Sequence, residues 1–210
     1  DSPTEDKFTL QQADTLQKII KKIKNPPPWK HASNSAGVLR FNFDEFNMVR
    51  VGLSIYGLHP SPSTLYQLKL RPAVSLSSRI IGINTCKKNE TVSYGRNHTI
   101  KKDDTKIAIL PLGYFDGIHR AYSNTAKVLI RGQQAATVGT ICMDYMMVDI
   151  TTIPEAEIGD NVLIFGKDEY GNTLSPEQFA THGNTNIYEL ITCLGPRIQR
   201  IFICDKGIYK

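Results

Sequence analysis

The feature that most constrains the fold is a change in residue pattern near residue 60. Pro60, Pro62 and Pro72 bracket a short linker. Beyond it come short segments rich in Val, Ile and Thr, separated by turn signals such as Arg131-Gly132-Gln133. This pattern predicts a mostly antiparallel β domain over residues 61–210. The expected strands are 73–85, 91–94, 106–112, 127–131, 135–150 and 161–165, with a closing strand over 198–204.

Two helix-start signals interrupt the end of this β domain. Ser175-Pro176-Glu177-Gln178 has the pattern of a capping box with Pro at the first helical position. Asn186 followed by Glu189 is a weaker version of the same signal. Gly195-Pro196 is expected to end the second helix. The sequence therefore predicts two short helices before the last strand.

The residues before the linker follow an α/β pattern. Apolar residues recur at helical spacing over 8–24, which predicts an amphipathic helix with Thr9 as its N-cap. Pro26-Pro27-Pro28 then stops the helix, and residues 29–37 end in small hydrogen-bonding side chains. Residues 1–60 are thus predicted to form the last units of an α/β barrel or of a doubly wound sheet, folds whose ligands bind at the carboxyl ends of strands. They are too few to close either fold.

Composition narrows the class of protein and its partners. The formal net charge is +5, and the lysines are scattered in short doublets, which argues against nucleic-acid binding. No apolar run is long enough to cross a membrane. Four cysteines lie far apart without C-x-x-C spacing, so we expect no metal site and no disulfide framework, and a reducing cytoplasm fits best. The acidic start at Asp1 is not a signal peptide, and because it lacks Met we expect the sequence to begin within a longer chain.

The stretch over residues 46–57 places the charged Arg50 inside an apolar run, with Gly52 two residues later. The β-branched residues around them predict a buried strand. In a structural interpretation, Arg50 reaches a carboxylate at the rim of the fold and Gly52 marks a bulge. In a functional interpretation, both mark the close approach of a ligand to the backbone. The stretch alone favours the structural interpretation.

Four further polar groups interrupt apolar or glycine-rich contexts. Tyr94 precedes a glycine at the end of a predicted strand, and Tyr114 lies in a glycine-rich loop that follows another strand. Asp144 lies in a hydrophobic strand, and Tyr188 in the first turn of a predicted helix. Taken singly, Tyr94, Asp144 and Tyr188 are adequately explained as a turn tyrosine, an edge-strand acid and a packing tyrosine. For the Tyr114 loop a functional role and a structural turn are equally well supported.

Together these motifs resemble those of bacterial alanine racemases, in which they occur in the same order. The resemblance implies that residues 1–60 are the last units of a TIM-type α/β barrel and that residues 61–210 are the C-terminal β domain of such an enzyme. It also implies the interconversion of L-alanine and D-alanine, in a cytoplasm that supplies D-alanine for the cell wall. The matching motifs are His31-Ala32-Ser33-Asn34-Ser35, residues 47–57, Val92-Ser93-Tyr94-Gly95, Leu112-Gly113-Tyr114-Phe115-Asp116-Gly117, Gly139-Thr140-Ile141-Cys142-Met143-Asp144 and Tyr188-Glu189.

The resemblance implies a binding site for the cofactor pyridoxal 5'-phosphate. Arg50 would hydrogen-bond the pyridine nitrogen, with His31 behind it. Because an arginine keeps its proton, that nitrogen would stay unprotonated. Ser35 and the backbone N–H groups of Gly52 and Leu53 would hold the phosphate, to which Gly52 allows close approach, and the Tyr188 hydroxyl would add a contact. The cofactor-binding residues implied are His31, Asn34, Ser35, Arg50, Gly52, Leu53 and Tyr188.

The resemblance also implies a substrate site that two subunits share. Tyr94 would be the catalytic residue that exchanges a proton with one face of the alanine Cα. In the family, residues matching Tyr94, Tyr114 and Met143 reach into the partner subunit, which implies a homodimer. The substrate-binding residues implied are Tyr114, Arg120, Cys142, Met143 and Asp144.

One departure from the family limits this prediction. The Schiff-base lysine of the family, which also serves as the second base, lies in the first barrel strand, and no lysine of this sequence has a matching context. We therefore expect the 210-residue chain alone to be inactive. Two alternatives stay open: a racemase that acts on serine or on a broad set of amino acids, and a non-catalytic β-domain binding module.

Overall fold

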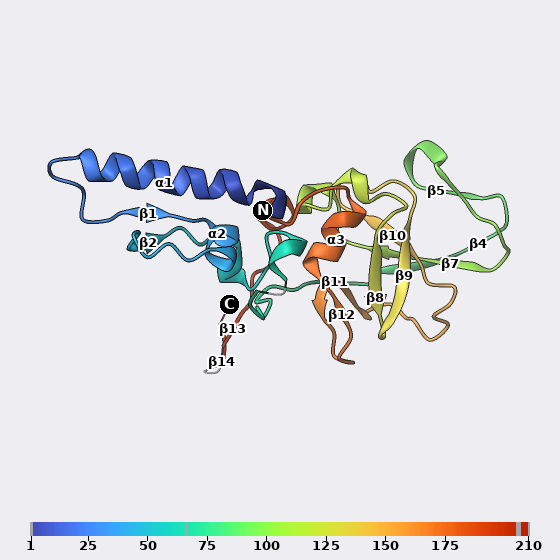
Figure 1. Cartoon of the computed structure of the whole chain (residues 1–210). Helices are drawn as coiled ribbons and strands as arrows, with labels where there is room; N and C mark the ends of the chain where they lie inside the picture. The colour runs from blue at the N-terminus through green and yellow to red at the C-terminus, as the bar shows by residue number, and fades with distance from the viewer. Residues whose placement is uncertain (1, 66, 205–206, 210) are drawn as a thin grey trace. The chain divides into compact units, whose positions relative to one another are not determined.

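The computed structural model describes residues 2–65, 67–204 and 207–209 (Figure 1). The chain divides into two compact units, Asp1–Val74 and Ser75–Lys210. We call them unit 1 and unit 2 and describe each by itself.

Unit 1 contains one long helix and a pair of short parallel strands. Helix α1 spans Asp6–Lys22, so the predicted helix is confirmed, two residues earlier than expected. The predicted cap is wrong: Glu5 is the N-cap residue, and Thr9 lies inside the helix, where its hydroxyl donates to the Glu5 carbonyl oxygen at 3.2 Å. The other elements are η1 (Pro3–Glu5), β1 (His31–Ala32), α2 (Ser35–Arg40), β2 (Met48–Val49), η2 (Leu53–Tyr56) and η3 (Pro62–Thr64).

The predicted buried strand over residues 46–57 is wrong. Strand β2 is only two residues long, and its Met48 and Val49 side chains are 37% and 51% exposed. Gly52 then turns the chain with φ −116° and ψ −85°. The backbone N–H of Ile55 bonds to the Gly52 carbonyl oxygen at 3.0 Å. Because this local 3-10 turn satisfies the backbone, residues 53–56 do not extend the ladder that β2 forms with β1.

Unit 2 is built on a curled sheet of antiparallel strands, as the sequence predicts (Figure 1). The strands follow the order β12-β11-β8-β9-β10-β7-β4, and β3 pairs with β11. The pairing of β10 with β7 sets Met146 opposite Leu110. The strands of this sheet are β3 (Leu76–Arg79), β4 (Gly82–Cys86), β7 (Thr105–Leu110), β8 (Lys127–Ile130), β9 (Gln133–Val138), β10 (Met146–Asp149), β11 (Asn161–Lys167) and β12 (Thr173–Leu174).

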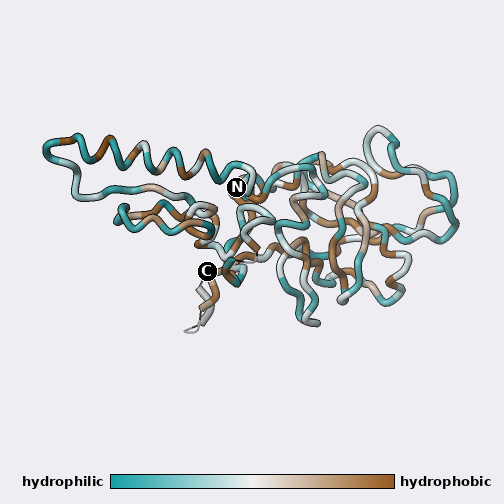
Figure 2. Tube along the Cα trace, viewed as in Figure 1, coloured by the Kyte–Doolittle hydropathy of each residue, from teal (hydrophilic) through white to brown (hydrophobic). Residues whose placement is uncertain are grey.

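The sheet carries most of the core of unit 2. Figure 2 shows apolar residues, in brown, distributed along its strands. Val128 on β8, Val148 on β10 and Phe165 on β11 are fully buried. The predicted turn between β8 and β9 is confirmed: Arg131 and Gly132 have φ of 49° and 76°, the left-handed pair that a two-residue hairpin needs.

Three predicted strands differ from the structure. The single strand expected over 73–85 is split into β3 and β4, which pair with β11 and β7, and the one expected over 135–150 is split by a loop between β9 and β10. The closing strand expected over 198–204 is reduced to β13 (Phe202–Cys204), which pairs with β14 (Gly207–Tyr209) rather than with the large sheet. Phe202 and Ile203 are 65% and 77% exposed, so β13 does not bury these two apolar residues. Apolar content alone did not reveal which strand would be the partner.

Both predicted helices of unit 2 are confirmed. Helix α3 (Pro176–His182) begins with a complete capping box, in which the Gln178 backbone N–H donates to Ser175 Oγ at 3.0 Å and the Ser175 N–H donates to Gln178 Oε1 at 3.3 Å. Helix α4 (Ile187–Thr192) begins at Asn186, whose side chain accepts the Glu189 N–H at 2.9 Å. No helix within the described ranges is long and apolar enough to cross a membrane.

Candidate functional site

Unit 1 contains a pocket of about 410 Å³ beside β1 and the start of α2. Its lining includes His31, Asn34 and Arg50, three of the residues singled out from the sequence, together with residues of α1 such as Gln12 and Leu16. The parallel pairing of β1 with β2 places His31 opposite Met48, which brings the chain just after each strand to the same edge. This edge is where polar side chains gather in α/β folds.

Arg50 and His31 are in direct contact in this pocket. Arg50 NH1 lies 2.7 Å from His31 Nδ1 and 3.5 Å from the His31 carbonyl oxygen. The Arg50 backbone N–H donates to the Ser33 carbonyl oxygen at 2.9 Å, which anchors the residue after β2 to the chain after β1. The contact between Arg50 and His31 is therefore as predicted, whereas the carboxylate partner of the structural interpretation is replaced by an imidazole.

Ser35 gathers backbone donors at the start of α2. Its buried Oγ accepts the Gly52 N–H at 3.1 Å and the Ser54 N–H at 3.2 Å. Leu53, the other expected donor, begins η2 with its side chain buried. Asn34 caps α2, since its Oδ1 accepts the Gly37 N–H at 3.0 Å. A serine hydroxyl and a turn of backbone N–H groups thus meet at one place.

Gly52 is not required by crowding within the chain. A Cβ atom added at this position would meet no heavy atom within 4 Å, and its φ of −116° suits any residue. The space beside its backbone is open. A ligand that approaches this backbone would find no side chain in the way.

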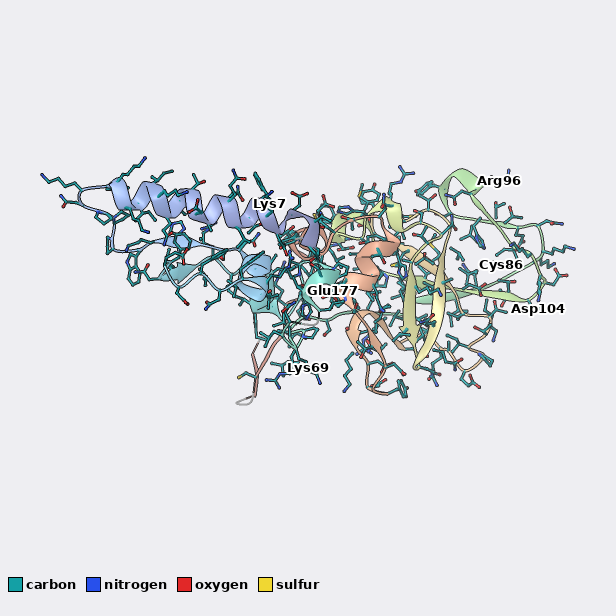
Figure 3. The ribbon with its side chains drawn as sticks, in the orientation of Figure 1. Lys7, Lys69, Cys86, Arg96, Asp104 and Glu177 are labelled. Atoms are coloured by element: carbon teal, nitrogen blue, oxygen red, sulfur yellow. The ribbon has the colours of Figure 1, made fainter. Side chains whose placement is uncertain are left out.

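In unit 2, three loops that the sequence singled out are joined, because one of them contacts each of the other two. We call them the Tyr94 loop (residues 93–97), the Tyr114 loop (residues 113–117) and the Met143 loop (residues 139–145). The Tyr94 loop follows β5 (Thr91–Val92), contains η4 (Tyr94–Arg96) and precedes β6 (His98–Thr99). Figure 3 labels Arg96 on this loop. Ser93 and Arg96 flank Tyr94 with φ of 66° and 49°, positions that non-glycine residues seldom adopt.

Thr140 joins the Tyr94 loop to the Met143 loop. Its hydroxyl donates to the Tyr94 carbonyl oxygen at 2.8 Å and accepts the Asn97 side-chain N–H at 2.8 Å. Its carbonyl oxygen accepts the Ser93 hydroxyl at 2.7 Å. Gly139 lies so close to Ser93 that an added Cβ would come within 2.7 Å of the Ser93 Cβ. The backbone around Tyr94 is therefore held, while the Tyr94 side chain is 74% exposed.

The Tyr114 loop lies directly against the Met143 loop. The backbone N–H of Tyr114 donates to the Cys142 carbonyl oxygen at 2.9 Å, and that of Phe115 donates to the Met143 carbonyl oxygen at 3.1 Å. Gly113 permits this contact, because a Cβ there would stand 2.3 Å from the Cys142 oxygen. The Tyr114 and Met143 side chains are 41% and 50% exposed. The structure thus brings together the loops of three predicted site residues.

The Tyr94 and Met143 loops also border a pocket of about 700 Å³. Tyr94 and Cys142 line it together with largely apolar residues of β4, β7 and β10. Cys86 on β4, labelled in Figure 3, is one of them, and burial raises the pKa of its thiol, with the nearby Glu90 charge adding to the shift. This lining gives an apolar surface beside the exposed Tyr94.

Two further predicted site residues of unit 2 lie on short helices. Arg120 begins η6 (Arg120–Tyr122) and is exposed. Tyr188 lies in the first turn of α4 with its side chain 40% exposed, and partial burial raises the pKa of its phenol.

Sequence reasoning missed a charged cluster that involves the Tyr114 and Met143 loops. Arg197 donates through Nε to Asp116 Oδ1 at 2.6 Å and through NH2 to Asp116 Oδ2 at 2.9 Å, and its NH1 lies 2.6 Å from Asp144 Oδ1. Asp116 is almost fully buried and also accepts the Gly113 N–H at 2.8 Å. Burial alone would raise the pKa of this carboxyl, but the hydrogen bonds and the charge of Arg197 outweigh burial and keep the pKa below its usual value. No local motif marks Arg197, because its partners are distant in sequence.

No group of three or more His, Cys, Asp or Glu side chains within the described ranges is placed to hold a metal ion. The cysteines at positions 86, 142, 193 and 204 carry free thiols.

Two family models match this chain. Residues 73–202 match the alanine racemase C-terminal domain, and residues 1–60 match the alanine racemase N-terminal domain. The chain belongs to the alanine racemase family. Its resemblance to alanine racemases, inferred from six short motifs, is therefore confirmed over most of its length.

Individual alanine racemases show how much of such a protein the chain covers. It is 38% identical over 191 residues to alanine racemase 2 of Caldanaerobacter subterraneus subsp. tengcongensis, a match that covers 91% of this chain and 48% of that protein. It is 36% identical over 207 residues to the alanine racemase of Clostridium perfringens, covering 97% and 53% respectively. The chain spans about half the length of the curated relatives it matches.

Solved alanine racemases have a similar fold. The crystal structure of the Bacillus anthracis enzyme with bound L-Ala-P superimposes with a TM-score of 0.88 at 30% identity and covers 100% of this chain and 54% of that one. The Clostridium difficile enzyme in complex with cycloserine gives a TM-score of 0.85 at 32% identity, covering 97% and 54%.

Proposed function

We propose that this chain provides part of an alanine racemase that interconverts L-alanine and D-alanine. The observation that carries the proposal is the meeting of the Tyr94, Tyr114 and Met143 loops in a member of this family. The relatives and solved structures reported above are all alanine racemases, whereas no observation favours a serine or broad-specificity racemase or a binding module.

The proposed cofactor is pyridoxal 5'-phosphate, and the residues of unit 1 fit it. In this structure Ser35 Oγ accepts the Gly52 and Ser54 N–H groups, and a bound phosphate would take up these donors together with the Ser35 hydroxyl. Arg50 offers a permanently protonated donor to a ring nitrogen, and His31 fixes its orientation at 2.7 Å. When bound, the cofactor supplies an electron-withdrawing ring that makes the amino-acid Cα proton easier to remove. Because Arg50 cannot transfer its proton to that ring, we expect it to moderate this withdrawal.

In this proposal Tyr94 moves the proton on one face of the alanine Cα. Its side chain is exposed, while the Thr140 and Ser93 hydrogen bonds keep its backbone in place. Tyr114, Cys142 and Met143 would surround the substrate, and Arg120 and Asp144 would lie near the entrance. A lysine with no counterpart in this sequence would serve the other face.

The proposal extends to the organisation of the intact protein. Residues 1–60 would be the last units of a TIM-type barrel and residues 61–210 the C-terminal β domain. The exposed Tyr94, Tyr114 and Met143 side chains would reach the active site of a partner subunit in a homodimer. The enzyme would work in the cytoplasm and supply D-alanine for the cell wall.

Complementation tests this proposal. The 210-residue chain would be produced alone and together with the half of the Caldanaerobacter relative that the match does not cover, and alanine racemisation would be measured with added cofactor. We expect activity only from the pair. Tyr94→Phe should lower the turnover number about 10²–10⁴-fold, the usual range for losing a general acid or base. Tyr170→Phe removes another exposed tyrosine hydroxyl and should leave turnover unchanged.

Several results would contradict the proposal. Robust turnover by the chain alone would show that no further lysine is needed. Faster turnover of serine or lysine than of alanine would favour a different racemase. Salt-sensitive binding of single-stranded DNA or RNA without any racemisation would favour a binding module.

A further inference from the structure

We propose that Arg197 is a positioning residue that fixes the Tyr114 and Met143 loops relative to each other and offsets part of the negative charge of their carboxylates, which would otherwise repel the carboxylate of an amino-acid substrate. This inference rests on the proposed function. Its structural basis is that one guanidinium contacts an acid from each loop, Asp116 and Asp144. Arg197 lies outside the motifs that the sequence singled out.

The bond to Asp116 fixes the shape of the Tyr114 loop. Asp116 receives two parallel N–H bonds from Arg197 and a third from the Gly113 backbone, so its carboxylate closes the loop on itself. The Asp116 side chain is only 3% exposed. A buried carboxylate that loses its ion-pair partner is costly to keep charged. Without Arg197, either the loop would rearrange or the Asp116 carboxylate would take up a proton.

The bond to Asp144 connects the second loop. Asp144 directly follows Met143, whose carbonyl oxygen accepts the Phe115 N–H. Arg197 therefore adds a side-chain bridge beneath the two backbone bonds that already join the loops. The guanidinium also lies over the Phe115 ring, with its Cζ 4.9 Å from the ring centroid.

Charge gives this bridge a second consequence. Two carboxylates beside a site for an amino acid would repel the carboxylate of that substrate. Arg197 places one positive charge between them, within 2.6 Å of each. Removal of this charge should thus weaken substrate binding as well as loosen the loops.

The geometry requires arginine rather than lysine. Three nitrogens of the planar group make three separate contacts, two with Asp116 and one with Asp144. A lysine ammonium is a point donor that can replace part of this fork but cannot reproduce its fixed spacing. Arg197→Lys should accordingly retain part of the effect, and Arg197→Met should lose it.

Arg131 offers a matched control in the same unit. Its guanidinium makes a comparable fork with Asp160, at 2.6 and 2.8 Å, and also contacts Glu157 at 2.9 Å. The side chains of Arg131 and Arg197 are 32% and 44% exposed. Arg131 joins the turn after β8 to the segment before β11 and touches neither the Tyr114 loop nor the Met143 loop. Arg131→Met thus removes an equivalent ion pair without touching the proposed site.

The first measurement does not depend on racemase activity. Amide hydrogen exchange of the 210-residue chain would follow the N–H groups of Gly113, Tyr114 and Phe115, which all bond within or between the two loops. Arg197→Met should speed their exchange about tenfold or more, Arg197→Lys less, and Arg131→Met not at all. Unchanged exchange in Arg197→Met would overturn the inference.

The second measurement uses the complemented racemase. Arg197→Met should raise the KM for alanine about tenfold and lower the turnover number as well, with partial rescue in Arg197→Lys. Arg131→Met should not share this effect, even where its melting temperature falls equally. An equal rise in KM for Arg131→Met would show that Arg197 only stabilises the fold and has no specific role in the site. If no combination racemises alanine, the proposed function fails, while hydrogen exchange still decides whether Arg197 positions the loops.

Discussion

Two polar atoms inside unit 2 are buried without a hydrogen-bond partner among the described residues: the Tyr122 hydroxyl and His182 Nδ1. Both belong to an aromatic cluster, in which Tyr122 stacks on Phe179 at 4.6 Å and His182 meets the edge of Phe179 at 6.2 Å. Burial, with smaller contributions from Glu189 and Cys193, raises the pKa of Tyr122 to about 12. The buried surroundings of this cluster therefore favour the uncharged forms of Tyr122 and His182.

His182 should make the stability of the chain depend on pH. Burial lowers the pKa of this histidine, and the nearby Lys127 charge lowers it further. The unfolded chain then takes up a proton near the ordinary histidine pKa of about 6.5, before the folded chain does. The stability that the neutral His182 provides is therefore present above that pH, and it is lost as the pH falls toward the pKa of His182 in the folded chain.

Replacement of His182 with Gln tests this pH dependence. We expect the melting temperature of the variant to fall less between about pH 7 and pH 5 than that of the parent chain, because one proton-uptake site is removed. A slope as steep in His182→Gln as in the parent would contradict the assignment.

Apart from the Thr9 cap, local signals predicted the helices and turns well, and they missed which strands would pair. The capping box at Ser175 and the turn at Arg131 depend only on neighbours in sequence, and both are confirmed. The strand expected over 46–57 and the closing strand over 198–204 depended on distant partners. Apolar composition cannot specify those partners, so both predictions were wrong.

The Ser175 cap should be worth a measurable part of the stability of unit 2. Ser175→Ala removes the acceptor for the Gln178 N–H at the start of α3 and should lower the free energy of unfolding by about 1 kcal/mol. Ser175→Thr keeps a hydroxyl acceptor and should lower it much less. Denaturant titration of the two variants measures the difference, and equal stabilities would show that the cap contributes nothing.

The same distinction between local and distant partners applies to the site as a whole. Tyr94, Tyr114 and Met143 could be found because each lies in a compact motif. Their mutual contact through Thr140 and the Met143 loop needed the fold. Arg197 could not be found at all, since one arginine after Gly195-Pro196 carries no local signal and its two acidic partners come from other loops.

At the scale of the molecule, burial is divided unequally between the two units. Among the residues of unit 1 that the structure describes, the buried apolar ones are Ala13, Ala36, Leu53 and Leu58. Unit 2 contains the remaining buried apolar residues, including the fully buried Tyr122, Phe165 and Phe179, and its sheet joins strands from β3 to β12. Since apolar burial supplies most of the free energy of folding, unit 2 should fold by itself and unit 1 should not.

Separate production of the two units tests this division. Residues 75–210 alone should unfold in one cooperative transition, with a midpoint close to that of the main transition of the full chain. Residues 1–74 alone should show no such transition, because two small and two larger side chains cannot offset the conformational entropy of that length. Denaturant titrations followed by near-UV circular dichroism would measure both. A cooperative transition of unit 1 alone would mean that its fold needs no further polypeptide, and it would weaken the proposal that these residues are the last units of a larger barrel.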